Sequence, residues 1–201
     1  DTAFAVGNGV YNGGTQSCDS RSNAFQVAYN VSTTVNGGSI LVQGTHGGGN
    51  GISVTGAGTR MFFDVNKSAF RAGSTTTNFF DDANVGQYSF AAGNNVFAIG
   101  NASAALGNGS RADWDNAMAF GFNARGAGSQ AMALGYYTQA QAYASQAFGV
   151  CNAYSGNTSS WNATDQLFVI GNGTLNGLGL SCATQQNALE VTKNGNLAMD
   201  T

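Results

Sequence analysis

The chain has 201 residues, a net charge of −3 and only seven lysines and arginines, which argues against a nucleic-acid-binding protein because such proteins need a basic surface. Its 30 glycines could suggest disorder, but 42 % hydrophobic and 11 % aromatic residues are enough for a packed core. Proline is absent, which suits strands that donate every backbone hydrogen bond, and no apolar run is long enough to predict a membrane span.

Residues 1–36 and 157–201 are predicted to be two copies of one end module. Asp165 repeats Asp1 at an offset of 164 positions, and many other residues keep the same offset. In the first copy these are Phe4, Gly7, Asn8, Gly9, Asn12, Ser17, Cys18, Asn23, Ala24, Val27 and Asn30. Each copy indicates a strand, a Gly-Asn-Gly turn, a loop and a second strand. We therefore expect one full repeat and the start of the next, from a filament of tandem units.

Residues 37–85 are predicted to form a small β domain that leads into the next segment. Apolar and β-branched residues over 39–43, 52–54 and 61–65 indicate short strands, and glycine-rich turns lie between them. No stretch of the whole chain has convincing helical periodicity, so we expect little helix.

From residue 86 to residue 156, small residues recur every seven positions. The glycines that keep this step are Gly86, Gly93, Gly100, Gly107, Gly121, Gly128, Gly135, Gly149 and Gly156. A heptad coiled coil does not fit, because a glycine in each heptad costs a helix about 1 kcal/mol and the large apolar seam is missing. Small residues alternate with larger ones around each glycine, which instead predicts an all-β fold. We expect a narrow parallel β-roll or solenoid with coils of about fourteen residues and two short strands per coil.

The predicted coil has three kinds of column. Alanine, serine and glycine make a uniformly small inward face. A polar column faces water and consists of Arg111, Asp113, Arg125, Gln139 and Gln141. An apolar column points outward, which marks a partner surface, and consists of Leu106, Met118, Phe120, Met132, Leu134 and Phe148. Burying these six side chains could contribute on the order of 10 kcal/mol per chain, so we expect an obligate oligomer.

Four motifs in this segment resemble the SVAIG-type head repeats of trimeric autotransporter adhesins, the YadA-like heads. They are NVFAIG (95–100), SAALG (103–107), AMAFG (117–121) and AMALG (131–135). The resemblance implies a left-handed β-roll that assembles with two identical chains, its apolar column turned toward the threefold axis. Trp114, Ala142 and Tyr154 depart from the pattern and predict local irregularities or loops.

The flanking segments resemble parts of trimeric fibre proteins from phages and bacteria. LFVIGNG (167–173) and NALEVTKNGN (187–196) resemble segments that follow such heads, and residues 58–86 resemble the segment that precedes them. The resemblance implies that the β domain over 37–85 is trimeric as well.

The chain has three cysteines, and the tandem repeat explains the odd number. If Cys151 pairs with Cys182, the partner of Cys18 would precede Asp1. Unpaired cysteines and an interchain bond are the alternatives. A disulfide would indicate an oxidising, extracellular setting.

Two sets of surface residues are candidates for glycan chemistry. N-x-S/T sequons, which carry glycans only if the source is a eukaryote or a virus of eukaryotes, occur at Asn30, Asn66, Asn101, Asn108, Asn157, Asn162 and Asn172. Aromatic residues that could bind a sugar occur at Trp114, Phe122, Tyr136, Tyr137 and Tyr143. The alternatives are turn formation by the asparagines and ladder packing by the aromatic residues.

The sequence gives little reason to expect catalysis. The carboxylate clusters Asp81-Asp82 and Asp113-Asp115 are more simply explained as turns than as a glycosidase pair, and the single histidine, His46, has no nucleophile or metal-ligand motif near it. We therefore expect no catalytic residue, no metal and no cofactor.

The interpretation that we favour is a noncatalytic, structural or adhesive segment of a homotrimeric, tandem-repeat extracellular fibre, on a cell surface or a virion. It would contact further copies of the repeat, and a surface glycan or receptor is a further expected partner. The alternative is a viral tail spike that binds or degrades polysaccharide.

Overall fold

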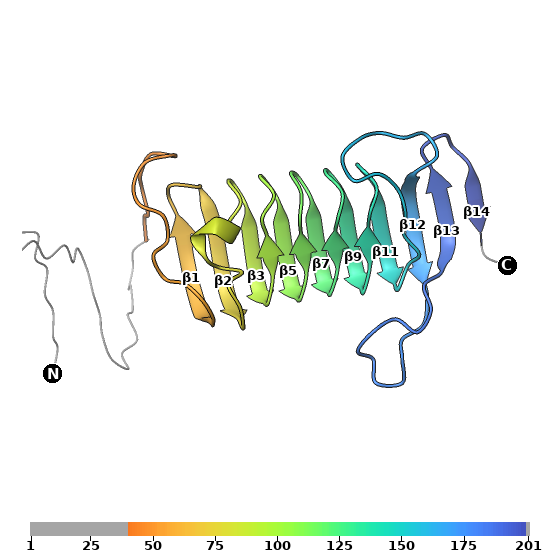
Figure 1. Cartoon of the computed structure of the whole chain (residues 1–201), viewed down its shortest axis with the longest axis horizontal. Coiled ribbons are helices and arrows are strands. Elements are labelled where there is room, and N and C mark those ends of the chain that lie inside the picture. Colours follow the sequence, from red (N-terminus) through yellow and green to blue (C-terminus); the bar gives the residue numbers. More distant parts are fainter. Residues whose placement is uncertain (1–39, 200–201) are drawn as a thin grey trace, which may run out of the picture. The chain divides into compact units, whose positions relative to one another are not determined.

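The computed structural model describes residues 40–199, and its part from Val42 onward forms one compact unit. This unit is all-β apart from one 3-10 turn, η1 (Asp82–Asn84), as the sequence predicts (Figure 1). The strands are β1 (Gly58–Asp64), β2 (Ala69–Thr75), β3 (Phe90–Asn94), β4 (Phe97–Ala98), β5 (Ala104–Asn108), β6 (Arg111–Ala112), β7 (Met118–Phe122), β8 (Arg125–Gly126), β9 (Met132–Tyr136), β10 (Gln139–Ala140), β11 (Gln146–Val150), β12 (Gln166–Asn172), β13 (Asn187–Thr192) and β14 (Leu197–Met199).

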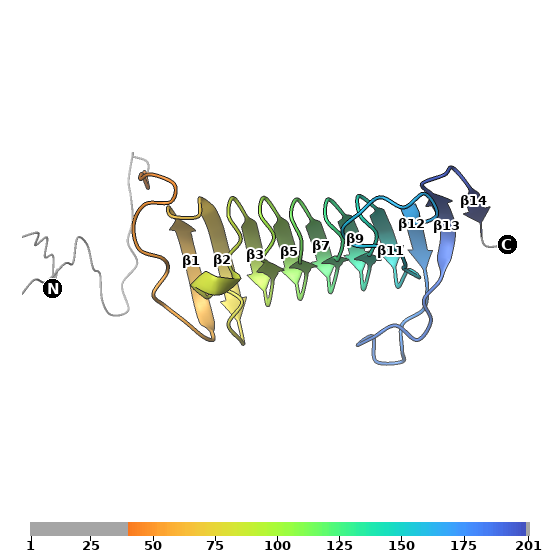
Figure 2. The ribbon, with the colours of Figure 1, turned by 45° about the horizontal axis from the view of Figure 1, so that its top comes forward.

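The strands form two sheets that together make a roll. The larger sheet has the order β1-β2-β3-β5-β7-β9-β11-β12-β13-β14, and the smaller has the order β10-β8-β6-β4. Pairing is parallel from β2 to β12 and antiparallel at both ends, between β1 and β2 and from β12 to β14. Figure 2 shows the coils that succeed one another along the roll.

Each coil is fourteen residues long. Ala105 pairs with Ala119, and Ala119 pairs with Ala133, so the register advances by the same step from one coil to the next. From β3 to β11 this makes about four turns, and the predicted solenoid is confirmed. The corners have a positive φ at every seventh residue, namely Tyr88, Asn95, Ala102, Gly109, Asn116, Asn123, Gln130, Tyr137, Ala144 and Cys151.

Small side chains fill the interior of the roll. Ala105, Ala119 and Ala133 are fully buried. Gly121 has a φ of +136°, and a Cβ there would lie closer than 3.0 Å to the carbonyl oxygen of Gly135 in the next coil. Gly93, Gly107 and Gly135 stand in the same column with the same close approach. Successive coils are therefore too close together at this column to admit a side chain.

Two of the three departures from the glycine pattern leave the coil undisturbed. The register on either side of Trp114 and Ala142 keeps the fourteen-residue step, so an irregularity there is wrong, and both residues lie in the turn that recurs in the regular coils. Neither position has a positive φ. Tyr154 does mark a change, because Phe168 of β12 pairs with Gln146 after a longer loop.

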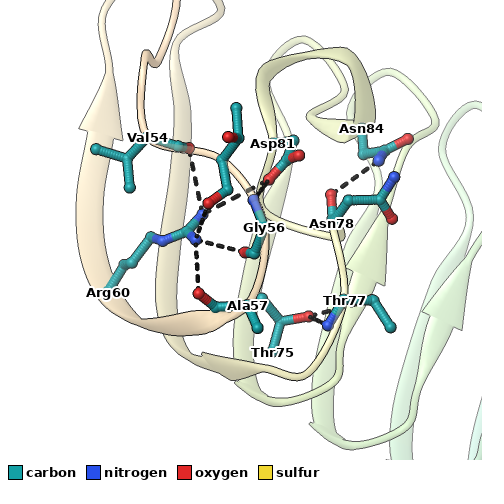
Figure 3. Close-up of polar contacts among 10 residues, drawn as sticks. Val54, Gly56, Ala57, Arg60, Thr75, Thr77, Asn78, Asp81 and Asn84 are labelled. Carbon is teal, nitrogen blue, oxygen red and sulfur yellow. Dashed lines mark hydrogen bonds and ion pairs between the residues drawn. The ribbon is translucent and has the colours of Figure 1, made fainter.

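The segment before the roll has fewer strands than predicted. Residues 40–43 and 52–54 form no strand, and over 52–57 side chains bond to several backbone groups instead. Arg60 donates to the carbonyls of Val54 and Ala57 at 3.3 Å each, and Asp81 accepts from the Gly56 amide at 2.7 Å (Figure 3). A loop whose polar groups bond to side chains has no need of a partner strand.

Different side chains close the two ends of the roll. At the N-terminal end the buried guanidinium of Arg71 donates to the carbonyls of Ser89, at 3.2 Å, and Ala98, at 2.7 Å, and the fully buried Phe80 packs edge-on against Phe62. At the C-terminal end the side-chain amide of Asn152 accepts from the Gln139 amide at 2.8 Å and donates to the Gln139 carbonyl at 3.0 Å. The buried Asn152 thus stands in for a further strand beside β10.

Candidate functional site

The outward side of the larger sheet carries two parallel apolar columns. Register pairs place the first along Phe63, Phe70, Phe90, Ala104, Met118, Met132, Gln146, Phe168, Val191 and Leu197. The second runs along Met61, Ala72, Ala92, Leu106, Phe120, Leu134, Phe148, Ile170, Leu189 and Met199. We call these two columns the apolar face. It crosses all ten strands, and Gln146 is its single polar side chain.

The six residues predicted to contact other chains all lie on the apolar face. Met118 and Leu134 are 40 % and 43 % exposed, and the other four are half-buried by their neighbours in the column. The face also extends beyond the roll, to Met61, which is 75 % exposed, and Ile170. The sequence analysis missed these extensions, although the alternation of residues 61–63 and 168–170 carries the signal.

One end of the larger sheet gathers three of the five predicted aromatic residues. The rings of Phe122 and Tyr136 stack at 4.7 Å, and Tyr137 meets both rings edge-on at 5.6 and 5.2 Å. The hydroxyl of Tyr136 donates to the Gly179 carbonyl at 2.9 Å, and that of Tyr137 donates to the Leu180 carbonyl. The ladder packing therefore occurs, and it also anchors the loop between β12 and β13.

The other two aromatic residues lie elsewhere. Trp114 lies in a turn and is 43 % exposed. Tyr143 accepts a hydrogen bond from Gln130 at 2.8 Å and lies 5.8 Å from the ammonium of Lys193. The structure therefore does not bring the five predicted aromatic residues into one surface.

Lys193 occupies a polar cluster at the C-terminal end of the unit. Its ammonium lies 3.9 Å from Asp165 Oδ2 and 4.8 Å from the centre of the Trp161 ring. Burial lowers the pKa of Lys193, and the charge of Asp165 offsets part of that effect. The cluster ties β13 to the loop after β11 and fits a structural role.

The polar column is a chain of charged and amide side chains on the smaller sheet. Asp113 accepts from Arg111 at 3.1 Å and from Arg125 at 2.6 Å, so one carboxylate serves two guanidinium groups. Gln139 donates to Gln141 at 2.6 Å. Both arginine side chains remain nearly half exposed.

Cys151 and Cys182 form a disulfide, with an S–S distance of 2.05 Å. The bond ties the β12–β13 loop to the corner after β11. Cys151 is fully buried, although its corner position gave no reason to expect burial. Cys18 lies outside the described residues.

The predicted carboxylate clusters and the histidine have structural partners. Asp81 and Asp82 hold the 52–57 loop, and Asp115 accepts from the Asn101 amide at 2.8 Å. His46 is exposed, stacks on Tyr88 at 4.6 Å and bonds to Ser68 at 3.2 Å. Among residues 40–199 no group of three or more His, Cys, Asp or Glu side chains is arranged to hold a metal ion.

The sequons that the structure describes lie at the surface. Asn66 is half-buried, and the exposed ones are Asn101, Asn108, Asn157, Asn162 and Asn172. Several also organise turns, as expected: Asn157 Oδ1 accepts from the Ser159 and Ser160 amides at 2.9 and 3.0 Å. Asn30 lies outside the described residues.

In the part of the chain that the structure describes, no helix is long and apolar enough to cross a membrane. Comparison with known proteins gives no identity: no family model, no curated protein and no solved structure matches this chain.

Proposed function

We propose that this chain is a noncatalytic, structural or adhesive segment of a homotrimeric extracellular fibre. The observation that carries the proposal is the apolar face, which runs over all ten strands of the larger sheet. A surface of that length and composition is typical of a face that another chain covers.

The energetics favour burial of this face between identical chains. A large apolar side chain contributes roughly 1.5–3 kcal/mol when it goes from exposed to buried, and Met118 and Leu134 still expose about two fifths of their surface. Each of the three chains would bring the same columns, so a symmetric assembly covers all three faces at once. The interior of the roll is lined mainly by alanines such as Ala105, Ala119 and Ala133, which bury little apolar surface each, so the outer face has a larger share of the stability.

The disulfide supports the extracellular part of the proposal. Cys151 and Cys182 are joined within the chain, and such bonds persist in oxidising compartments. The tandem repeat of residues 1–36 supports the fibre, because a unit that recurs along a chain builds a long, thin assembly.

A pair of matched lysine variants tests the trimer. Leu134→Lys places a charge on the apolar face, where burial between chains would cost several kcal/mol for each lysine. Gln141→Lys places the same charge on the smaller sheet and serves as the control. We expect the first variant to be a folded monomer and the second to keep the native mass. Equal masses for both variants would contradict the proposed interface.

The proposal that the chain is noncatalytic has its own test. The purified chain is incubated with capsular polysaccharides, and new reducing ends are measured. We expect none, whereas release of oligosaccharides would favour a polysaccharide-degrading tail spike.

A further inference from the structure

A pocket of about 290 Å³ opens on the smaller sheet, beside the aromatic end of the roll. Its lining includes the corner residues of three successive coils, Gly109, Asn123 and Tyr137. Arg111 and Arg125 of the polar column stand along one side. None of the residues that line the pocket is an aspartate or a glutamate.

The charge beside this pocket is not balanced. Arg111 and Arg125 pair in register on neighbouring strands, and among residues 40–199 Asp113 is the one carboxylate that bonds to them. Arg125 uses only its Nε for that bond, at 2.6 Å, and its side chain is 46 % exposed. Its two terminal nitrogens thus remain available to bind a carboxylate in the bidentate manner that guanidinium groups favour.

The remaining lining suits a polyhydroxylated ring. Asn123, Gln139 and Gln185 bring amides that donate and accept hydrogen bonds, and the rings of Tyr137 and Tyr154 add flat apolar surface. Tyr154 is 40 % exposed. The pocket volume lies near the lower end of the roughly 300–1,000 Å³ of small-molecule sites, which is room for about one sugar ring.

Part of the lining comes from a distant part of the sequence. Cys182 and Gln185 belong to the loop between β12 and β13, which lies below the ends of β9 and β11 in Figure 1. The disulfide to Cys151 and the hydroxyl of Tyr136, which donates to the Gly179 carbonyl, hold the loop there. The pocket is therefore preformed by covalent and hydrogen bonds.

We propose that this pocket binds a carboxylate-bearing sugar residue of a glycan, with Arg125 on the carboxylate. The inference deepens the adhesive part of the proposed function and rests on it. It places the sugar in the pocket of the smaller sheet, and Trp114 and Tyr143 take no part.

The test is a calorimetric titration of the full chain with each of two matched probes. The first probe is a glucuronate-containing tetrasaccharide of hyaluronan, and the second is the same tetrasaccharide with its carboxyl groups reduced to alcohols. We expect the acidic probe to bind at least about tenfold more tightly than the reduced one, as loss of a charged hydrogen-bonded pair implies. No binding of the acidic probe, or equal affinity for both probes, would overturn the proposal.

Variants locate the binding. Arg125→Gln removes an exposed side chain whose one ion pair is at the surface, so the fold should persist, and we expect about a tenfold or greater loss of affinity. Arg125→Lys keeps the charge without the planar fork and should bind with intermediate affinity. Gln185→Ala should weaken binding. The matched control is Gln186→Ala, which changes the exposed neighbouring residue and should leave the affinity unchanged. Wild-type affinity in Arg125→Gln would contradict the assignment.

The native mass of each sample separates this inference from the fibre proposal. A trimer that does not bind the acidic probe would refute the pocket alone. A monomer that binds it would refute the trimer and leave the pocket standing.

Discussion

The close approach of successive coils is tested most sharply at Gly121. Replacing it by alanine adds one methyl group to the column of glycines that stack from coil to coil. The new Cβ would lie closer than 3.0 Å to the carbonyl oxygen of Gly135, and this obstacle is backbone rather than a flexible side chain. The φ of +136° at Gly121 is a second obstacle, since alanine rarely adopts it.

The loss of stability in Gly121→Ala follows from the strained backbone and the close approach. A backbone conformation of this kind costs a non-glycine residue about 1–3 kcal/mol. Relief of the close approach requires β7 and β9 to separate, which weakens backbone hydrogen bonds that each contribute about 0.5–1.5 kcal/mol. We expect Gly121→Ala to lower the free energy of unfolding by about 3–5 kcal/mol, a large share of the 5–15 kcal/mol typical of a domain.

Guanidinium unfolding followed by circular dichroism, at one protein concentration, measures this cost. Gly177→Ala is the matched control, because a Cβ at Gly177 would meet no heavy atom within 4 Å and its φ is not positive. The control should unfold within about 0.5 kcal/mol of the wild type. If Gly121→Ala unfolds at the same midpoint as the control, the argument for a roll without room at this column fails.

Three further variants test the ends of the unit. Changing both Cys151 and Cys182 to serine should lower the free energy of unfolding by about 3–4 kcal/mol, since the bond spans 31 residues, and thermal melts with and without reductant measure the loss. Arg71→Met should cost about 3 kcal/mol because the Ala98 carbonyl loses its donor, and an unchanged melting temperature would argue against this cap. Because burial lowers the pKa of Lys193, the unfolded chain binds that proton more tightly, so stability should rise with pH from the lowered pKa up to 10.5, and a Lys193→Met variant that keeps the rise would contradict this reasoning.

The spacing of small residues was sufficient to predict the coil. The glycines recur every seven positions, and the apolar and polar residues on the opposite face alternate every fourteen. Each coil therefore has fourteen residues and two glycine positions, and the pairing of Ala105 with Ala119 agrees. The sequence does not distinguish the two glycine series, however. Gly93 and its equivalents have a positive φ, whereas Trp114 and Ala142 stand in the other series, which has none along the regular coils, and leave the register unchanged.

The ends of the roll could not be predicted in the same way, because they depend on single side chains without a repeat. Arg71 caps one end with bonds to carbonyls of residues 18 and 27 positions away. Asn152 closes the smaller sheet by imitating a strand with its amide. Residues 52–54 likewise have the composition of a strand, but bonds from Arg60 and Asp81 hold the segment as a loop.

The candidate pocket was outside the reach of the sequence for a similar reason. The corner residues in its lining recur with the period of the coil. Gln185, however, lies in a loop of irregular sequence, which the disulfide of Cys182 holds beside the roll. The aromatic prediction joined Trp114 and Tyr143 to Tyr137, because column position alone does not say at which end of a strand a side chain lies.

The native mass of the chain by light scattering, with and without reductant, tests the central claim most directly. We expect three times the chain mass of 20.5 kDa in both conditions, because the contacts lie on the apolar face and the disulfide joins residues of one chain. A monomer in either condition would contradict the trimeric fibre.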